Sequence, residues 1–152
     1  MKKFLSALLI LTLFVSCSID NTPVDYVTKN EKDISDFIAK NHLTVEKSNT
    51  GLYYMIEEPG TGAQPTAYSN VTVTYKGFFL DGTIFDQNTS PGITIGLDQV
   101  IKGWTEGLQH FKEGGKGVLF VPAHLGYGNY NYNGIPGGSV LVFEINLISV
   151  NN

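Results

Sequence analysis

Hydrophobic and polar residues alternate along several stretches of this chain, which is the pattern of half-buried β-strands. The clearest stretch starts at Val71, and the Asp81-Gly82 pair after it predicts a hairpin. A shorter strand is expected over residues 83–86, before a Pro-Gly break and the sequence ITIG. These signals indicate two antiparallel strands joined by a tight turn.

Three further strands are indicated elsewhere. One is expected over residues 52–57, where Pro59-Gly60 closes it. Another starts at residue 116, is apolar on both faces and stops at Pro122. The closing strand, residues 139–150, has one apolar face, which we expect to point inward. That face consists of Leu141, Phe143, Ile145 and Leu147.

Two helices are predicted from apolar residues spaced three or four positions apart. The first covers residues 30–41, with Asn30 as its expected N-cap. Its apolar face is formed by Ile34, Phe37 and Ile38. The second is a short central helix over about residues 102–111. Many strands and one short central helix predict an α+β fold, in which an antiparallel sheet wraps around that helix.

The first 16 residues have the features of a secretory signal. Two lysines precede an apolar run of about a dozen residues, which is too short to span a membrane. The sequence FVSC that follows resembles a bacterial lipobox, in which Cys17 is lipid-modified and becomes the N-terminus. Ordinary signal cleavage nearby is the alternative. Cys17 is the only cysteine, so we expect no disulfide in the folded part.

We therefore expect four parts along the chain. They are a signal peptide (1–16), a lipidated cysteine with a polar tether (17–29), a helical extension (30–50) and a folded domain (51–152). The lipid would anchor the protein to a bacterial membrane in the cell envelope. Ser18, rather than an aspartate, follows the cysteine and favours the outer membrane, whereas the periplasmic and the external face both stay open.

Charge and spacing exclude several classes of function. Without the first 16 residues the chain has 8 lysines, no arginine and 14 acidic residues, a net charge of −6. Nucleic-acid binding needs a basic face against the phosphates, so that class is excluded. No metal site is predicted, because His42, His110 and His124 lie far apart without a second ligand at metal spacing. Ser139 lacks the Gly-x-Ser-x-Gly surroundings of a hydrolase nucleophile.

A set of aromatic residues remains, and Trp104, the only tryptophan, starts the central helix. Taken singly, each aromatic residue is most simply a part of the core. Together with Val100, Ile101 and Ile135 they would line an apolar hollow with a few polar groups, the usual form of a small-ligand site. The aromatic residues are Tyr75, Phe85, Trp104, Tyr127 and Phe143.

Four sequence blocks carry a resemblance to a known family. They are, in order, VTVTYKGFFLDGTIFDQ, VIKGWTEGL, GGKGVLFVPAHLGYG and IPGGSVLVFEINLI. Their order and spacing resemble those of the FKBP-type peptidyl-prolyl cis–trans isomerases, the macrolide-binding immunophilins, over residues 52–150. The resemblance implies a five-stranded antiparallel sheet around one short helix, in agreement with the hydrophobic pattern.

The resemblance also implies a role for each site residue. Trp104 would form the floor of a proline pocket, and Tyr127 would offer its hydroxyl to a substrate carbonyl. Asp86 would be the polar residue beside the pocket, and the Ile101 N–H would hold a ligand carbonyl. The aromatic walls would be Tyr75, Phe85 and Phe143. The rim would consist of Val100 and Ile101, overhung by Ile135.

By this resemblance, the reaction is rotation of Xaa-Pro bonds in exported polypeptides, without a cofactor. Amide resonance gives this rotation a barrier of about 18–20 kcal/mol. A dry aromatic cavity disfavours the planar, more dipolar amide more than the twisted one, which lowers the barrier. Macrolide inhibitors are a further ligand class that the resemblance implies.

Some residues depart from the family pattern. No arginine is present to pair with Asp86, and Ile93 at best replaces a wall aromatic. Asn131 and Tyr132 stand where some members have histidine. These differences bear on macrolide affinity more than on isomerase activity. A domain that only holds Pro-containing segments, as a chaperone or adaptor, is the alternative function. A scaffold without a working pocket is a third.

Overall fold

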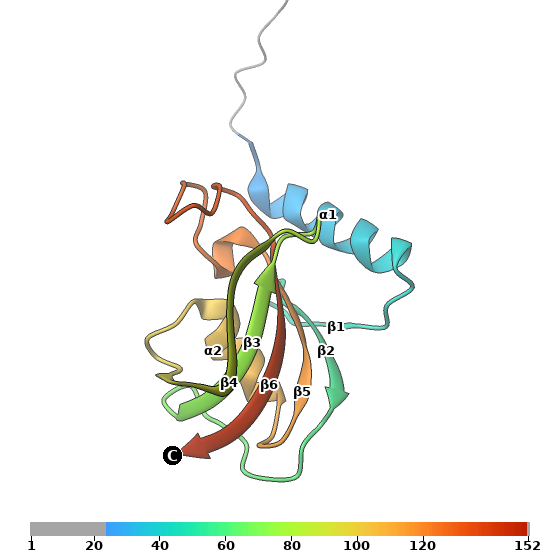
Figure 1. The fold of residues 1–152 in the computed structure, drawn as a ribbon. Coiled ribbons are helices and arrows are strands. Elements are labelled where there is room, and N and C mark those ends of the chain that lie inside the picture. The colour runs from blue at the N-terminus through green and yellow to red at the C-terminus, as the bar shows by residue number, and fades with distance from the viewer. Residues whose placement is uncertain (1–23, 152) are drawn as a thin grey trace, which may run out of the picture.

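The computed structural model describes residues 24–151 and shows a curved antiparallel sheet around a short helix (Figure 1). Within these residues, six strands pair in the order β1-β2-β5-β6-β3-β4. Their bounds are Glu46–Lys47 (β1), Tyr53–Glu58 (β2), Asn70–Phe78 (β3), Ile84–Gly96 (β4), Lys116–Val121 (β5) and Leu141–Asn151 (β6). The α+β class is confirmed, but the expected count of five strands is wrong. The additional strand is the two-residue β1, which pairs with β2.

Helix α2 (Lys102–Gly107) packs closely against the concave face of the sheet. Two of its glycines permit this approach. A Cβ on Gly103 would lie 2.5 Å from Cγ1 of Val121, and a Cβ on Gly107 would lie 2.5 Å from Cδ1 of Leu119. Both partners belong to β5, so α2 rests directly on that strand, and larger residues at either position would push the helix away.

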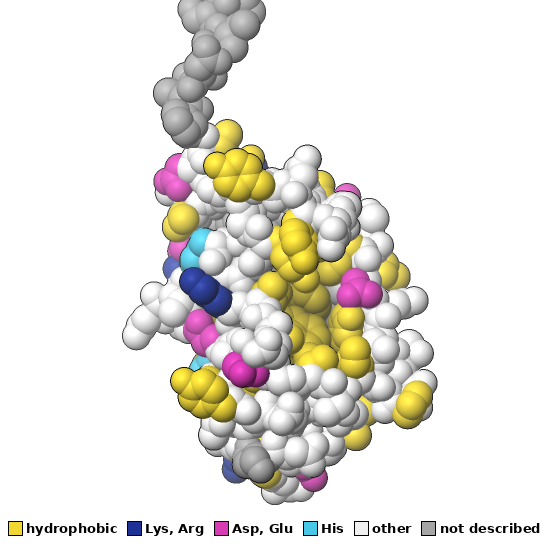
Figure 2. Space-filling view, turned by 90° about the vertical axis from the view of Figure 1, so that its left-hand side faces the viewer, with side chains coloured by type: hydrophobic (Ala, Val, Ile, Leu, Met, Phe, Trp, Pro, Cys, Tyr) yellow, Lys and Arg dark blue, Asp and Glu magenta, His cyan; other side chains and the backbone are white. Residues whose placement is uncertain are grey.

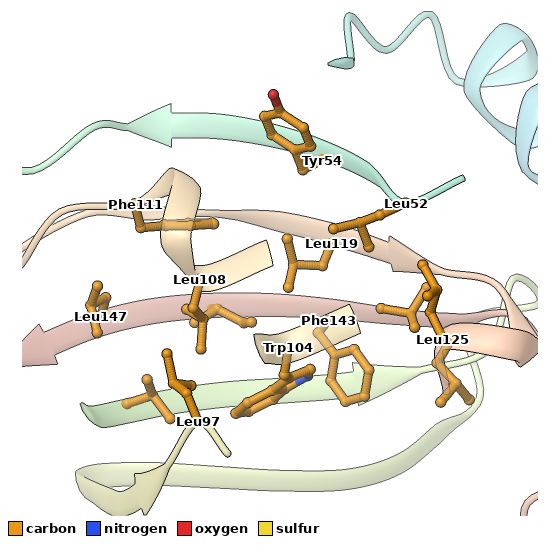
Figure 3. Close-up of a cluster of buried hydrophobic side chains, with 14 of the residues drawn as sticks. Leu52, Tyr54, Leu97, Trp104, Leu108, Phe111, Leu119, Leu125, Phe143 and Leu147 are labelled. Atoms are coloured by element: carbon orange, nitrogen blue, oxygen red, sulfur yellow. The ribbon is translucent and has the colours of Figure 1, made fainter. Parts of the chain in front are cut away.

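The main core lies between α2 and the sheet. Trp104 and Leu108 extend from the helix and the 3-10 turn that follows it (Leu108–His110) into a cluster with Leu97 and Phe143 (Figure 3). The central helix predicted from the sequence is therefore confirmed, with its last turn in the tighter 3-10 form. The inward face of β6 is also confirmed as buried: Leu141, Phe143, Ile145 and Leu147.

Helix α1 (Tyr26–Lys40) begins earlier than the sequence pattern predicts. Asp25 is its N-cap, with a side chain that accepts hydrogen bonds from two backbone N–H groups of the first turn. The prediction that Asn30 caps the helix is therefore wrong, and residues 26–29, expected as part of the tether (17–29), belong to the helix. Asn30 instead lies inside the helix, is only 1% exposed and bonds to distant parts of the chain.

The predicted apolar face of α1 packs on the face of the sheet opposite α2. Ile34 is fully buried, and the ring of Phe37 lies 5.9 Å from that of Phe120 on β5. Alternate residues of β5 therefore serve two cores, one under each helix. Helix α1 thus belongs to the same packed unit as the sheet (Figure 1).

Strand β4 is longer than predicted, because it continues through the expected break at Pro91-Gly92. Residues 89–92 lie opposite Thr74 alone and form a bulge. A proline is tolerated there because β4 is an edge strand and the bulge needs no ladder hydrogen bond from its nitrogen. The predicted turn at Asp81-Gly82 is confirmed by a 2.8 Å hydrogen bond from the glycine N–H back across the turn.

Residues 1–23 and 152, which include the predicted signal peptide and Cys17, lie outside the described part of the chain. The expected cleavage and lipidation therefore stay predictions. Among residues 24–151, no helix combines the length and the hydropathy that a bilayer span requires.

Candidate active site

A hollow of about 400 Å³ opens between β3, β4, β6, the start of α2 and the loop of residues 126–138. Hydrophobic side chains gather in a hollow on the face of the molecule seen in Figure 2. Eight of the nine pocket residues predicted from the sequence line it. They are Tyr75, Phe85, Asp86, Val100, Ile101, Trp104, Tyr127 and Phe143. Residues separated by almost 70 positions in sequence therefore meet at one site.

Perpendicular aromatic rings form the floor and walls of the hollow. The indole of Trp104 meets the ring of Tyr75 at 5.0 Å and 87°, and the ring of Phe143 at 5.2 Å and 85°. Phe85 completes the wall, 5.6 Å from Phe143 at 90°. Edge-to-face contacts of this kind are favourable and directional, so each ring restricts the orientation of the next. We call these four residues the aromatic box.

A glycine on β3 makes room for the aromatic box. A Cβ on Gly77 would lie 2.7 Å from Cζ of Phe85 and 3.0 Å from Cε1 of Phe143. Any side chain at this position would displace both rings. The glycine therefore serves the site rather than the strand, where it is otherwise unfavourable.

The polar edge of the hollow is a tyrosine–aspartate pair. The hydroxyl of Tyr75 donates a 2.6 Å hydrogen bond to Oδ2 of Asp86. Burial, and then this hydrogen bond, raise the pKa of Tyr75 well above its usual value. A tyrosine hydroxyl is protonated at neutral pH, and the raised pKa keeps this one protonated in alkaline solution as well, so the phenol holds the carboxylate at the edge of the aromatic box.

Two stacked tyrosines form the opposite rim. The rings of Tyr127 and Tyr132 lie 4.7 Å apart and nearly parallel, at 11°. Burial raises the pKa of Tyr127, with smaller contributions from Tyr132 and Asp86. Its hydroxyl makes no hydrogen bond to another group of residues 24–151, so it is a free donor beside the hollow.

The sequence marked Tyr132 only as a departure from the family pattern, and the resemblance assigned the overhang to Ile135. The structure places Tyr132 in the lining, whereas Ile135 is 8% exposed and belongs to the core cluster. The two residues pair across an Asn133-Gly134 turn through two backbone hydrogen bonds, of 2.9 and 2.8 Å. This Asn-Gly pair is a hairpin signal, and it could have indicated that the loop folds back over the site.

Three other residues line the hollow, and the sequence predicted only one of them. Ile93 lines the hollow, as expected of a residue that replaces a wall aromatic. Ile95 and Gln99 were not predicted, because Ile95 alternates like any strand residue and Gln99 lies in a turn. Val100 and Ile101 follow at the start of α2, in agreement with their predicted place at the rim. The role of the Ile101 N–H stays a prediction.

A larger hollow, of about 590 Å³, lies on the outer face of the sheet. Its lining is mainly polar and includes the Lys76–Glu144 ion pair, with 2.7 Å between Nζ and Oε2. Among its lining residues Tyr75 alone is aromatic, so it offers no set of rings around a ligand. The smaller hollow with the aromatic box is therefore the candidate active site.

A curved antiparallel sheet around a short helix, with a tryptophan-floored aromatic hollow at one side, defines a domain with an aromatic-lined candidate ligand site. Sequence comparison then gives the family. The family model for FKBP-type peptidyl-prolyl cis-trans isomerase matches residues 62–148, and the chain belongs to this family.

Individual relatives extend the likeness beyond the matched range. The chain is 42% identical over 133 residues to the FKBP-type peptidyl-prolyl cis-trans isomerase FkpA of Escherichia coli (strain K12). The aligned region covers 80% of this chain and 49% of that protein. The crystal structure of FkpA from Escherichia coli has a TM-score of 0.69 at 40% identity and covers 82% of this chain and 63% of that one.

A peptidyl-prolyl cis-trans isomerase from Pseudomonas syringae pv. tomato gives a TM-score of 0.73 at 35% identity. It covers 87% of this chain, which in turn covers 98% of that structure. The chain spans about half the length of the curated relatives it matches.

Proposed function

We propose that this chain catalyses cis–trans isomerisation of Xaa-Pro bonds in polypeptides that bind in the aromatic hollow. The observation that carries the proposal is the aromatic box, in which the rings of Tyr75, Phe85 and Phe143 form walls around the Trp104 floor. A hollow of about 400 Å³ with this lining accepts a prolyl ring and its neighbours. Relatives at 35% and 42% identity that carry the isomerase name support it.

The chemistry needs no nucleophile or proton transfer. Resonance keeps the amide planar, and the barrier to rotation is about 18–20 kcal/mol. At the twisted geometry the amide is less dipolar, so an apolar cavity stabilises it relative to the planar forms. The prolyl ring would rest on Trp104, inside the aromatic box, where little water remains.

Polar groups at the rim would hold the substrate in place. The Tyr127 hydroxyl is protonated at neutral pH, and burial raises its pKa further, so it can donate to a substrate carbonyl. The Ile101 N–H would hold a second carbonyl. These hydrogen bonds orient the chain on either side of the rotating bond and take no proton from it.

Holding Pro-containing segments without turnover is the second candidate function. Exposed tyrosines in the loop beside the hollow favour it, since Tyr130 is 85% and Tyr132 51% exposed. Such side chains add binding area for an unfolded polypeptide without contributing to rotation. The two candidates differ in one measurable quantity, the rate of Xaa-Pro exchange.

Exchange of a short Xaa-Pro peptide, followed by NMR with and without a macrolide inhibitor, tests the proposal. We expect the wild-type protein to accelerate exchange, and Trp104→Ala to abolish most of the acceleration. The control is Tyr68→Ala, because Tyr68 is 82% exposed and lies outside the hollow. A folded wild-type protein that leaves the peptide at its rate in buffer would leave only the binding candidate.

We propose that Cys17 carries a lipid that anchors the protein to a bacterial membrane, with the domain in the cell envelope. The support is the sequence alone: a short apolar run after two lysines, the FVSC motif, and the absence of any second cysteine. The expected membrane is the outer one. Cys17→Ser should move the protein from the membrane fraction to the soluble fraction, and a variant that stays in the membrane would contradict lipidation at this residue.

A further inference from the structure

One buried side chain of α1 reaches the base of the loop that borders the hollow. Asn30 is 1% exposed, although asparagine is usually a surface residue. Its Oδ1 accepts a 2.8 Å hydrogen bond from the N–H of Ala123, and its Nδ2 donates a 2.9 Å bond to the carbonyl of Gly138. One amide thus joins the two ends of the segment that carries the tyrosine pair.

The backbone completes the connection into a closed ring of hydrogen bonds. The N–H of Gly138 donates to the carbonyl of Gly128 at 2.9 Å, and the N–H of Gly128 donates to the carbonyl of Ala123 at 2.8 Å. With Asn30 between Ala123 and Gly138, every link of this ring is made. Gly128 directly follows Tyr127 in sequence, so the ring fixes the backbone beside the free hydroxyl of the rim.

A second contact of α1 supports the same point. The ring of Tyr26 lies against Gly138, where an added Cβ would come within 1.8 Å of Cε1. Gly138 also has a φ of 76°, which glycine adopts without strain. Helix α1 therefore holds the end of the loop by a hydrogen bond from its interior and by an aromatic ring from its first turn.

Resting on the proposed isomerase function, we infer that Asn30 is a positioning residue for the substrate-binding loop, which makes α1 a working part of the active site. The residue lies outside the range that the family model matches, 62–148. Loss of the Asn30 Nδ2 donor leaves the Gly138 carbonyl without that partner and breaks the ring of hydrogen bonds. The loop would then hold Tyr127 and Tyr132 less firmly, while the aromatic box, which Asn30 does not touch, would keep its geometry.

Asn30→Asp is the variant of choice because it keeps the size of the side chain and the acceptor for Ala123, but replaces the donor to Gly138. The matched control is Asn41→Asp at the C-cap of the same helix, where the lost bond runs from Nδ2 to the Phe37 carbonyl in the last turn. Kinetics of a short Xaa-Pro peptide are measured with the full chain, at a temperature where circular dichroism shows every variant folded.

We expect Asn30→Asp to raise KM about tenfold with little change in kcat, since the loop holds substrate and the aromatic box promotes rotation. The control should stay within about twofold of wild type. A purely structural role would reduce the folded fraction, which lowers the apparent kcat and leaves KM unchanged. That pattern, or an unchanged KM, would overturn the inference.

Amide hydrogen exchange tests the ring of hydrogen bonds independently of activity. Faster exchange is expected at Gly128 and Gly138 in Asn30→Asp, with no change at Leu147 of β6, whose N–H donates to the Gly115 carbonyl just before β5. Unchanged protection at both glycines would refute the inference even if the wild type proved inactive. If Asn30→Asp does not fold, Tyr26→Ala must raise KM about threefold, because it loosens the same loop end, and an unchanged KM would refute it.

Discussion

Replacement of Trp104 by phenylalanine is expected to lower isomerase activity far more than it lowers stability. Trp104 is 5% exposed, and the smaller ring buries about three fewer carbon-sized groups, which costs about 2 kcal/mol. The indole Nε1, however, is buried without a hydrogen-bond partner among residues 24–151. Removing an unpaired buried donor is favourable by about 1–3 kcal/mol. The two effects oppose each other, so the free energy of unfolding should change by about 1 kcal/mol or less.

The contact with substrate has no such compensation. The indole of Trp104 has two fused rings, and phenylalanine has only one. In Trp104→Phe, a bound prolyl ring therefore loses the contacts that it makes with the second ring of the indole. About ten atom pairs at 0.1–0.2 kcal/mol each amount to roughly 1–2 kcal/mol of lost transition-state contact. The expected loss in kcat/KM is therefore about tenfold.

The assay compares kcat/KM for an Xaa-Pro peptide with the free energy of unfolding from urea titrations. Phe120→Leu is the matched control, because Phe120 is 1% exposed but faces α1, on the other side of β5 from the hollow. This control should lose about 1–2 kcal/mol of stability and keep its activity. Full activity in Trp104→Phe, or the same loss of activity in Phe120→Leu, would refute the tryptophan floor.

Three further predictions use the same two measurements. Tyr127→Phe should reduce kcat/KM about threefold, since the hydroxyl only orients the substrate, and Tyr68→Phe should leave it unchanged. Because burial raises the pKa of Tyr75, the folded state resists ionisation of this hydroxyl. Its contribution to the free energy of unfolding should be fully present below about pH 10 and fall as pH rises above it. Tyr75→Phe should lessen that fall in urea titrations between about pH 8 and pH 11. Gly103→Ala should lower the free energy of unfolding by about 1–3 kcal/mol, because its Cβ would lie 2.5 Å from Val121, and an unchanged urea midpoint would contradict that clash.

Much of the fold could be predicted from the period-two pattern, because β3, β5 and β6 each have a continuous buried face. Val71 and Val73, for example, alternate with polar residues and are fully buried. The errors lie where local signals are ambiguous. A strand of two residues, β1, is too short to show any period, and Pro91-Gly92 reads as a break unless the strand is known to lie at an edge, where a bulge can contain it.

The candidate site also has a part that the sequence could predict and a part that it could not. The aromatic box could be assigned because its residues stand on regular elements, where sequence position fixes the side of the sheet. The loop could not, because its path depends on the Asn133-Gly134 turn, which brings Tyr132 into the lining and leaves Ile135 in the core. The N-cap prediction for Asn30 is wrong for a related reason: asparagine before an apolar face favours a cap, whereas its partners in the structure are 93 and 108 residues away.

The two parts of the hollow are held by different means, and this has a functional consequence. The aromatic box is fixed by mutual ring contacts and by α2, whose glycines rest on β5. The tyrosine pair is fixed by backbone hydrogen bonds that close through Asn30 on α1. Turnover should therefore respond to changes in the core around Trp104, and substrate affinity to changes in α1. Since the second set of contacts reaches outside residues 62–148, affinity can vary among relatives whose matched domains carry the same aromatic box.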